Sequence, residues 1–187
     1  MELEKGLLEI VSLLEDAATP YMVIGGFANL AWGVPRTTQD VDITVQVEEE
    51  DLPDFLRETG KRFSVLPEDP EAFLRETRVL PVQTSNGIRI DLIFAGLPYE
   101  ETALARAREV KIQGRAVRIC SPEDLIIHKI ISERPRDRED VEGIFRQQGA
   151  TLDFPYLDRI IRELGEALSQ SDIVDFYETM KRSVGGT

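Results

Sequence analysis

The sequence predicts an α+β fold, in which a small mixed or antiparallel sheet is flanked by helices and followed by further helices. Short apolar runs alternate with helical patterns as far as residue 120. One of the intervening loops holds Asn86-Gly87, the strongest short signal for a β-hairpin. After Ser121 the patterns are all helical. We therefore expect an α/β core over residues 1–120 and a helical region, packed on it, over residues 121–187.

Length and composition are those of an acidic globular protein. The chain has 187 residues, of which 42% are hydrophobic, and a formal net charge of −13. Nucleic-acid backbones attract clustered Lys and Arg, so generic DNA binding is not expected of so acidic a chain. We see no signal peptide and no apolar stretch long enough to span a bilayer. The sequence therefore predicts a cytoplasmic protein without a membrane partner.

The first expected elements alternate between helix and strand. Leucines and valines recur at helical spacing over residues 2–17, and Pro20 ends that pattern. The run Tyr21–Ile24 then predicts a strand, which breaks at a glycine pair before a short helix. A loop over residues 33–39 leads to a second strand over residues 40–47.

The later elements follow from turn and capping signals. Ser121 is a good N-cap, and Pro122 suits the first helical position. We expect a strand at 63–66, hairpin arms at 78–84 and 88–94, a second hairpin at 110–120, and helices at 48–60, 71–75, 100–108, from 121 onward, 136–148, 155–168 and 170–182.

The stretch from Tyr21 to Val47 is the candidate site. Gly25 and Gly26 allow a tight turn before a helix, whose N-terminal N–H groups and dipole favour a phosphate. Asp40 and Asp42 lie two apart on a strand, so both carboxylates leave the same face. Two adjacent carboxylates repel each other, and a hard cation such as Mg²⁺ relieves that repulsion. The pattern indicates a metal-assisted reaction on a nucleoside triphosphate.

The glycine pair, the short helix and the R-x-[ST]-x-D-x-D stretch together resemble the nucleotidyltransferase fold of the DNA polymerase β superfamily. Within it, the chain is most similar to the AbiEii-type and related minimal bacterial nucleotidyltransferases. The resemblance implies that Gly25 and Gly26 hold the triphosphate. It also implies that Asp40 and Asp42, with a third carboxylate on a later strand, bind two Mg²⁺ ions.

Asp91, within IRIDLIF, is the candidate for the third carboxylate. It alternates with Ile90 and Leu92, so it faces away from the apolar side, and by periodicity alone it is a solvent-facing residue. The order of the motifs supports the other interpretation. By resemblance, Asp91 is a metal ligand and a general base for the acceptor.

Three further residues are candidates for nucleotide binding. Arg36 and Thr38 lie either in a polar surface loop or against the triphosphate, where Arg36 would neutralise charge. Lys129 is either a lysine whose stem covers apolar surface or, by resemblance, a phosphate ligand. Asp137 and Asp140 are expected to form surface ion pairs with Arg136 and Arg138, or to cap a helix.

The expected function is Mg²⁺-dependent transfer of a nucleoside monophosphate from a nucleoside triphosphate, such as ATP, to an acceptor hydroxyl, with release of pyrophosphate. Two alternatives stay open: a toxin of a toxin–antitoxin pair that acts on RNA or protein, and a non-catalytic nucleotide-binding module. The acceptor is left open between a small molecule, a protein and RNA. A homo-oligomer and an antitoxin partner are also left open.

Overall fold

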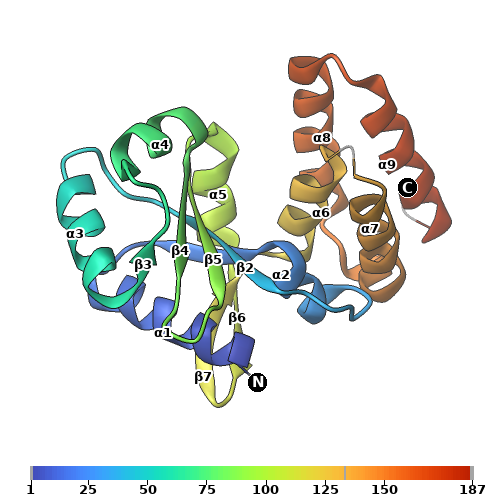
Figure 1. The fold of residues 1–187 in the computed structure, drawn as a ribbon. Helices are drawn as coiled ribbons and strands as arrows, with labels where there is room; N and C mark the ends of the chain where they lie inside the picture. Colours follow the sequence, from blue (N-terminus) through green and yellow to red (C-terminus); the bar gives the residue numbers. More distant parts are fainter. Residues whose placement is uncertain (1, 133, 186–187) are drawn as a thin grey trace. The chain divides into compact units, whose positions relative to one another are not determined.

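A mixed β-sheet organises the first part of the chain, as predicted (Figure 1). The computed structural model describes residues 2–132 and 134–185; the other residues of the two expected regions, 1, 133, 186 and 187, lie outside this part. The described part of the chain forms two compact units, residues 2–27 with 37–119, and residues 28–36 with 120–132 and 134–185. None of their helices is both long and apolar enough to cross a membrane.

The sheet has seven strands in the described part of the chain, in the order β3-β4-β5-β2-β1-β7-β6. The strands are β1 (Tyr21–Ile24), β2 (Asp40–Val45), β3 (Ser64–Val65), β4 (Val79–Gln83), β5 (Arg89–Phe94), β6 (Arg108–Ile112) and β7 (Arg115–Ile119). β2 runs parallel to β5 and β1 parallel to β7, whereas the other neighbours are antiparallel. The sheet is therefore mixed, and two central strands that are distant in sequence lie side by side.

Helices cover both faces of the sheet within the first unit (Figure 1). They are α1 (Glu2–Asp16), α3 (Leu52–Arg62), α4 (Pro70–Thr77) and α5 (Pro98–Arg106). On β2, Val41, Ile43 and Val45 are fully buried on one face. Because side chains alternate along a strand, Asp40 and Asp42 leave by the opposite face. The alternation thus buries the apolar residues and keeps the two acids out of that core.

The second unit is helical. It contains α6 (Pro122–Ile130), α7 (Pro135–Gln148), a 3-10 turn (Gly149–Thr151), α8 (Phe154–Leu168) and α9 (Ser171–Ser183). The helix α2 (Gly25–Trp32) begins in the first unit and ends in the second. Trp32 holds that end, because its indole N–H donates to the Cys120 carbonyl at 2.7 Å. Residues 28–36 therefore belong structurally to the helical unit, although Trp32 and Cys120 are 88 positions apart in the sequence.

Most predicted elements are confirmed within a few residues. The Asn86-Gly87 hairpin pairs β4 with β5, and the Ser121 hydroxyl accepts from the Asp124 backbone N–H at 3.1 Å as an N-cap. Two boundaries were wrong: the second strand ends at Val45, and the following helix begins at Leu52. Residues 48–51 form a turn before α3, because the acidic run adds no apolar face that would extend the helix.

Candidate active site

The turn between β1 and α2 brings a glycine against a carboxylate. Ile24, the last residue of β1, lies opposite Asp42 in the antiparallel register. Gly25 follows with φ +64°, in the left-handed region that favours glycine. A Cβ built on Gly25 would lie 2.0 Å from Asp42 Oδ2. Glycine is therefore required here twice, for the backbone conformation and for the approach of the Asp42 carboxylate.

The parallel pairing of β2 with β5 places Asp42 directly beside Asp91. Adjacent strands lie about 4.8 Å apart, and residues in register share a face, so both carboxylates project from the same side of the sheet. Asp91 lies between the fully buried Ile90 and Leu92 and is itself only half-buried, as the alternation predicted. The two acids are far apart in sequence, and only the strand order makes them neighbours.

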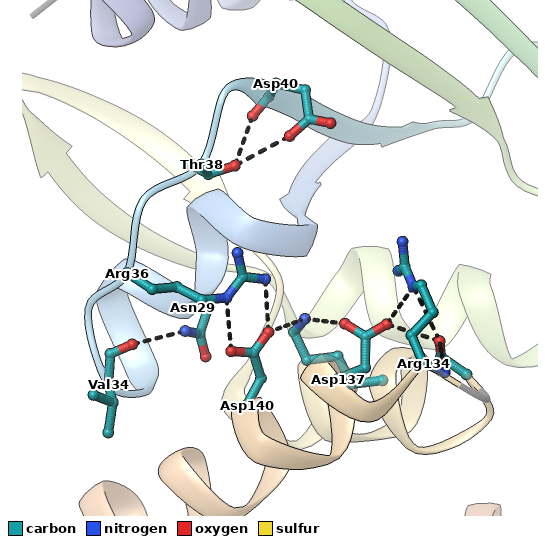
Figure 2. A network of polar contacts seen from close by, with 10 residues as sticks. Asn29, Val34, Arg36, Thr38, Asp40, Arg134, Asp137 and Asp140 are labelled. Atoms are coloured by element: carbon teal, nitrogen blue, oxygen red, sulfur yellow. Dashed lines mark hydrogen bonds and ion pairs between the residues drawn. The ribbon is translucent and has the colours of Figure 1, made fainter.

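Asp40 begins β2 and is held by its own loop. The Thr38 hydroxyl donates to Asp40 Oδ1 at 3.1 Å and to the Asp40 carbonyl oxygen at 3.3 Å (Figure 2). Both residues are solvent-exposed or nearly so. Thr38 therefore contacts a candidate metal ligand, whereas the sequence had offered it as a nucleotide ligand.

The three carboxylates fit a divalent cation in their chemistry and in their placement on the sheet. Oxygen donors are the ligands that Mg²⁺ prefers, and Asp42 and Asp91 are adjacent in register. The side chain of Asp91 is instead turned to Arg89, whose Nε donates to both carboxylate oxygens at 3.0 and 3.3 Å. Accordingly, the described residues contain no group of three acidic, His or Cys side chains already arranged around a metal position. Metal binding would require Asp91 to exchange Arg89 for the ion.

Arg36 and Lys129 meet on one carboxylate of the second unit. Asp140 accepts from Arg36 Nε at 2.8 Å and from Arg36 Nη2 at 2.7 Å, a bidentate pair (Figure 2). It also accepts from Lys129 Nζ at 2.6 Å. Lys129 is only 4% exposed, so it is not the surface lysine that the sequence allowed. The two candidate phosphate ligands are thus joined in a single ion-pair network.

Asp137 completes this network one helical turn away on α7. It accepts from Lys129 Nζ at 2.8 Å, from the Ser132 hydroxyl at 2.7 Å and from Arg134 Nε at 2.6 Å. Burial alone would raise the pKa of Asp137 and Asp140, but the hydrogen bonds from Lys129 and its neighbours outweigh it. The pKa of each carboxyl is lowered, so both stay ionised in the folded protein.

The expectation of surface ion pairs for Asp137 and Asp140 was wrong. The two residues are 3% and 5% exposed, and their partners are Lys129, Arg36 and Arg134. The sequence contained a pattern that indicates the burial of these two aspartates. Asp137 and Asp140 fall at helical spacing with the buried Val141 and Ile144, on the core-facing side of α7. A charged residue in an apolar stripe requires a buried partner.

Together, the mixed sheet, the glycine turn before a helix and the aspartates on two parallel strands define a protein with the nucleotidyltransferase fold. The family model described as "Nucleotidyl transferase of unknown function (DUF2204)" matches residues 3–182. The chain belongs to this family, and it is an enzyme that transfers a nucleotidyl group. A search of curated proteins finds no match. The closer likeness to AbiEii-type proteins stays a prediction.

Several solved structures share the fold. The antibiotic-resistance factor ANT(2'')-Ia is 18% identical, with a TM-score of 0.56 over 90% of this chain and 96% of that one. A nucleotidyltransferase-like antigen from Paracoccidioides brasiliensis is 16% identical, with a TM-score of 0.53 over 95% and 93%. The lincomycin-bound lincosamide adenylyltransferase LnuA is 14% identical, with a TM-score of 0.52 over 75% and 94%. At these identities the likeness extends to the fold alone.

Proposed function

We propose that this enzyme moves a nucleoside monophosphate from a nucleoside triphosphate to an acceptor hydroxyl, with Mg²⁺ as its cofactor and pyrophosphate as the second product. The observation that carries the proposal is the register of β2 with β5. It sets Asp42 beside Asp91, on the face where Gly25 meets the Asp42 carboxylate. A glycine backbone that packs directly against a carboxylate can also come close to a phosphate that arrives with a metal ion.

Each residue of the proposed site has a separate task. The backbone N–H groups of Gly25 and Gly26, at the start of α2, bind the triphosphate, which the helix dipole also favours. Asp40, Asp42 and Asp91 hold the metal, and Thr38 orients Asp40. Bound Mg²⁺ supplies charge neutralisation for the entering and leaving oxygens. Asp91 accepts the proton of the acceptor hydroxyl when Arg89 no longer occupies its carboxylate.

Arg36 and Lys129 are proposed as phosphate ligands on the condition that the triphosphate can displace Asp140 from them. Asp140 binds both cations, so a triphosphate must compete with that carboxylate for them. Lys129→Met tests the condition, because methionine keeps the length of the apolar stem and removes the charge. If Lys129 binds phosphate, the variant loses nucleotide affinity at a pH and temperature where it remains folded.

We propose a small molecule as the acceptor. LnuA is lincomycin-bound in its structure, and ANT(2'')-Ia has been determined with adenylyl-2''-tobramycin. A formal net charge of −13 disfavours an RNA acceptor, whose phosphates would be repelled. The acceptor hydroxyl must reach the α-phosphate beside Asp91, which is the geometric requirement for in-line transfer.

The first test needs no acceptor. Thermal unfolding is measured with each ribonucleoside triphosphate, with and without Mg²⁺, for the wild type, Asp42→Asn and the control Glu76→Gln. Glu76 is an exposed residue of α4, so the control makes the same charge change away from the site. A ligand at about 100 times its dissociation constant adds roughly 2.7 kcal/mol of stability.

We expect a Mg²⁺-dependent rise in melting temperature in the wild type and in Glu76→Gln, and its loss in Asp42→Asn. The absence of any rise with millimolar triphosphate would contradict the proposal and favour a non-catalytic module. With binding established, transfer is followed by release of pyrophosphate in a screen of acceptors. An RNA or protein acceptor in that screen would instead support the toxin alternative.

A further inference from the structure

A cavity lies in the first unit at the end of β1 and β2 that is remote from Asp40 and Asp42. It is a cavity of about 650 Å³, within the range of small-molecule sites. Thr19 and Pro20, which precede β1, line it, as do Gln46 and Val47, which follow β2. Asp40 and Asp42 lie at the other end of β2. At about 3.3 Å per residue, Asp42 and Gln46 are roughly 13 Å apart along the strand, so this cavity is separate from the proposed active site.

The floor of this cavity is apolar. Leu13 of α1 and Phe55 of α3 line it, and both are almost fully buried. Ala17 and Val47 add further apolar surface. Phe55 also stands edge-on to Phe94 at 5.7 Å, which fixes the orientation of its ring. A ligand that fits this floor presents methylene or other apolar groups to it.

The rim is acidic and extended. Asp51, Asp54 and Glu58 line the cavity at helical spacing along α3, so they form a row about 10 Å long. Asp51 stands at the N-cap position of α3, yet its side chain makes no capping hydrogen bond. Glu48 and Asp16 also line the cavity. Among the described residues that line the cavity, Arg62 is the one cation, and it is bonded to Asp16 at 2.9 Å.

The cations that already pair with Asp54 and Glu58 do not lie in the cavity. Asp54 pairs with Arg57, and Glu58 pairs with Lys61 at 2.7 Å, but neither cation lines the cavity. These pairs are exposed and therefore weak. The side chains of Glu48 and Asp51 have no cationic partner among the described residues of the chain; the Glu48 carboxylate accepts a long bond from the Gln46 amide, at 3.4 Å. The side of the row that faces the cavity keeps an uncompensated negative potential.

We infer that this cavity is a binding site for a linear aliphatic polyamine. Its methylene spacers would lie on Leu13 and Phe55, and its ammonium groups would meet the successive carboxylates of the row. A single metal ion fits less well, because no three acidic side chains of the described residues converge on one point. A row of charges above an apolar floor instead matches a ligand in which charged and apolar groups alternate.

The inference is independent of the proposed transfer reaction. A ligand in this cavity is too far from Asp42 to contact the reacting atoms. It would act by binding the folded state at the loops that join α1 to β1 and β2 to α3. The polyamine therefore adds to the stability of the protein without competing with the triphosphate.

Isothermal titration with spermidine tests the inference on the whole chain. Three proteins are compared: the wild type, Glu48→Gln/Asp51→Asn, and Glu49→Gln/Glu50→Gln. The last pair makes the same charge change in the same exposed segment, but neither residue lines the cavity. A matched titration with MgCl₂ measures the response to a simple divalent cation.

We expect saturable binding of one spermidine in the wild type and in Glu49→Gln/Glu50→Gln, weakened at least tenfold in Glu48→Gln/Asp51→Asn. Equal weakening in both variants would assign the effect to the general negative charge and overturn the inference. Binding of Mg²⁺ with the same affinity and the same sensitivity to Glu48→Gln/Asp51→Asn would also overturn it. Triphosphate binding should be unchanged in both variants, so failure of this site and failure of the proposed reaction are distinguishable.

Discussion

The chain contains two pairs of neighbouring aspartates in opposite environments. Asp40 and Asp42 begin a strand, keep contact with solvent and lie beside a third acid, Asp91. Asp137 and Asp140 lie on α7, are almost fully buried and are neutralised by Lys129, Arg36 and Arg134. The second pair stabilises one arrangement of its own unit. Asp42 of the first pair lies in register with Asp91 at a sheet position that keeps contact with solvent, which is the property expected of a site that can take up a cation.

The largest expected difference between the two pairs is in stability. Asp140→Ala removes the carboxylate that binds both the Arg36 guanidinium and the buried Lys129 ammonium, which should lower the free energy of unfolding by roughly 3–5 kcal/mol. Asp40→Ala removes an exposed side chain and should change it by less than about 0.5 kcal/mol. Urea denaturation of both variants measures this. Equal losses would mean that the two pairs do not differ as described.

The same contrast predicts a response to acid. The folded-state pKa values of Asp137 and Asp140 lie below the ordinary value of 3.8. Their contribution to stability is therefore complete above that value and is lost as the pH falls through the lower folded-state values. The wild-type melting temperature should fall steeply below about pH 4, and that of Asp140→Asn should fall less. Parallel curves for the two proteins would assign acid unfolding to other groups.

Substitution of Gly25 tests whether the Asp42 carboxylate needs its close packing against a glycine. Gly25→Ala and Gly87→Ala both place a side chain at positive φ, at +64° and +86°, and each should cost about 1–2 kcal/mol of stability. A Cβ at Gly87 meets nothing within 4 Å, whereas one at Gly25 meets Asp42 Oδ2. Only Gly25→Ala should therefore lose the triphosphate-dependent thermal shift. Loss of that shift in both variants would remove the argument for a contact at Gly25.

The smallest expected effect concerns Arg89. The Arg89 side chain is itself exposed, so Arg89→Gln should change the free energy of unfolding by less than about 1 kcal/mol. Because Arg89 competes with a metal for the Asp91 carboxylate, the variant should need a few-fold less Mg²⁺ for half of the nucleotide-dependent thermal shift. A higher Mg²⁺ requirement would mean that Arg89 orients Asp91 for the metal.

Local sequence patterns were sufficient to predict the helices and strands, but they did not show which strands lie next to each other in the sheet. Local signals placed β1, the Asn86-Gly87 hairpin and the Ser121 cap, because each depends on residues close together in the chain. Asp42 and Asp91 are adjacent because two strands that are distant in the sequence pair in parallel, and no local pattern encodes that pairing. The resemblance to a known family supplied that relation where periodicity alone favoured a solvent-facing Asp91.

The partners of Arg36 and Lys129 were missed for the same reason. The charge pattern of α7 was read as a solvated surface, although Asp137 and Asp140 share its buried side with Val141. Helical spacing could have predicted their burial. Their pairing with Arg36 could not be predicted, since it joins residues 104 positions apart.

The assignment of residues 28–36 to the helical unit restricts how this protein can be divided or recombined. Separation of the fragments after cleavage between Ile119 and Cys120 would leave Trp32 without its carbonyl partner and Arg36 without Asp140. The C-terminal helices are therefore not a module that genetic exchange could transfer as one contiguous piece. A chimaera with the helices of a relative should fold only if it also carries that relative's segment corresponding to residues 28–36.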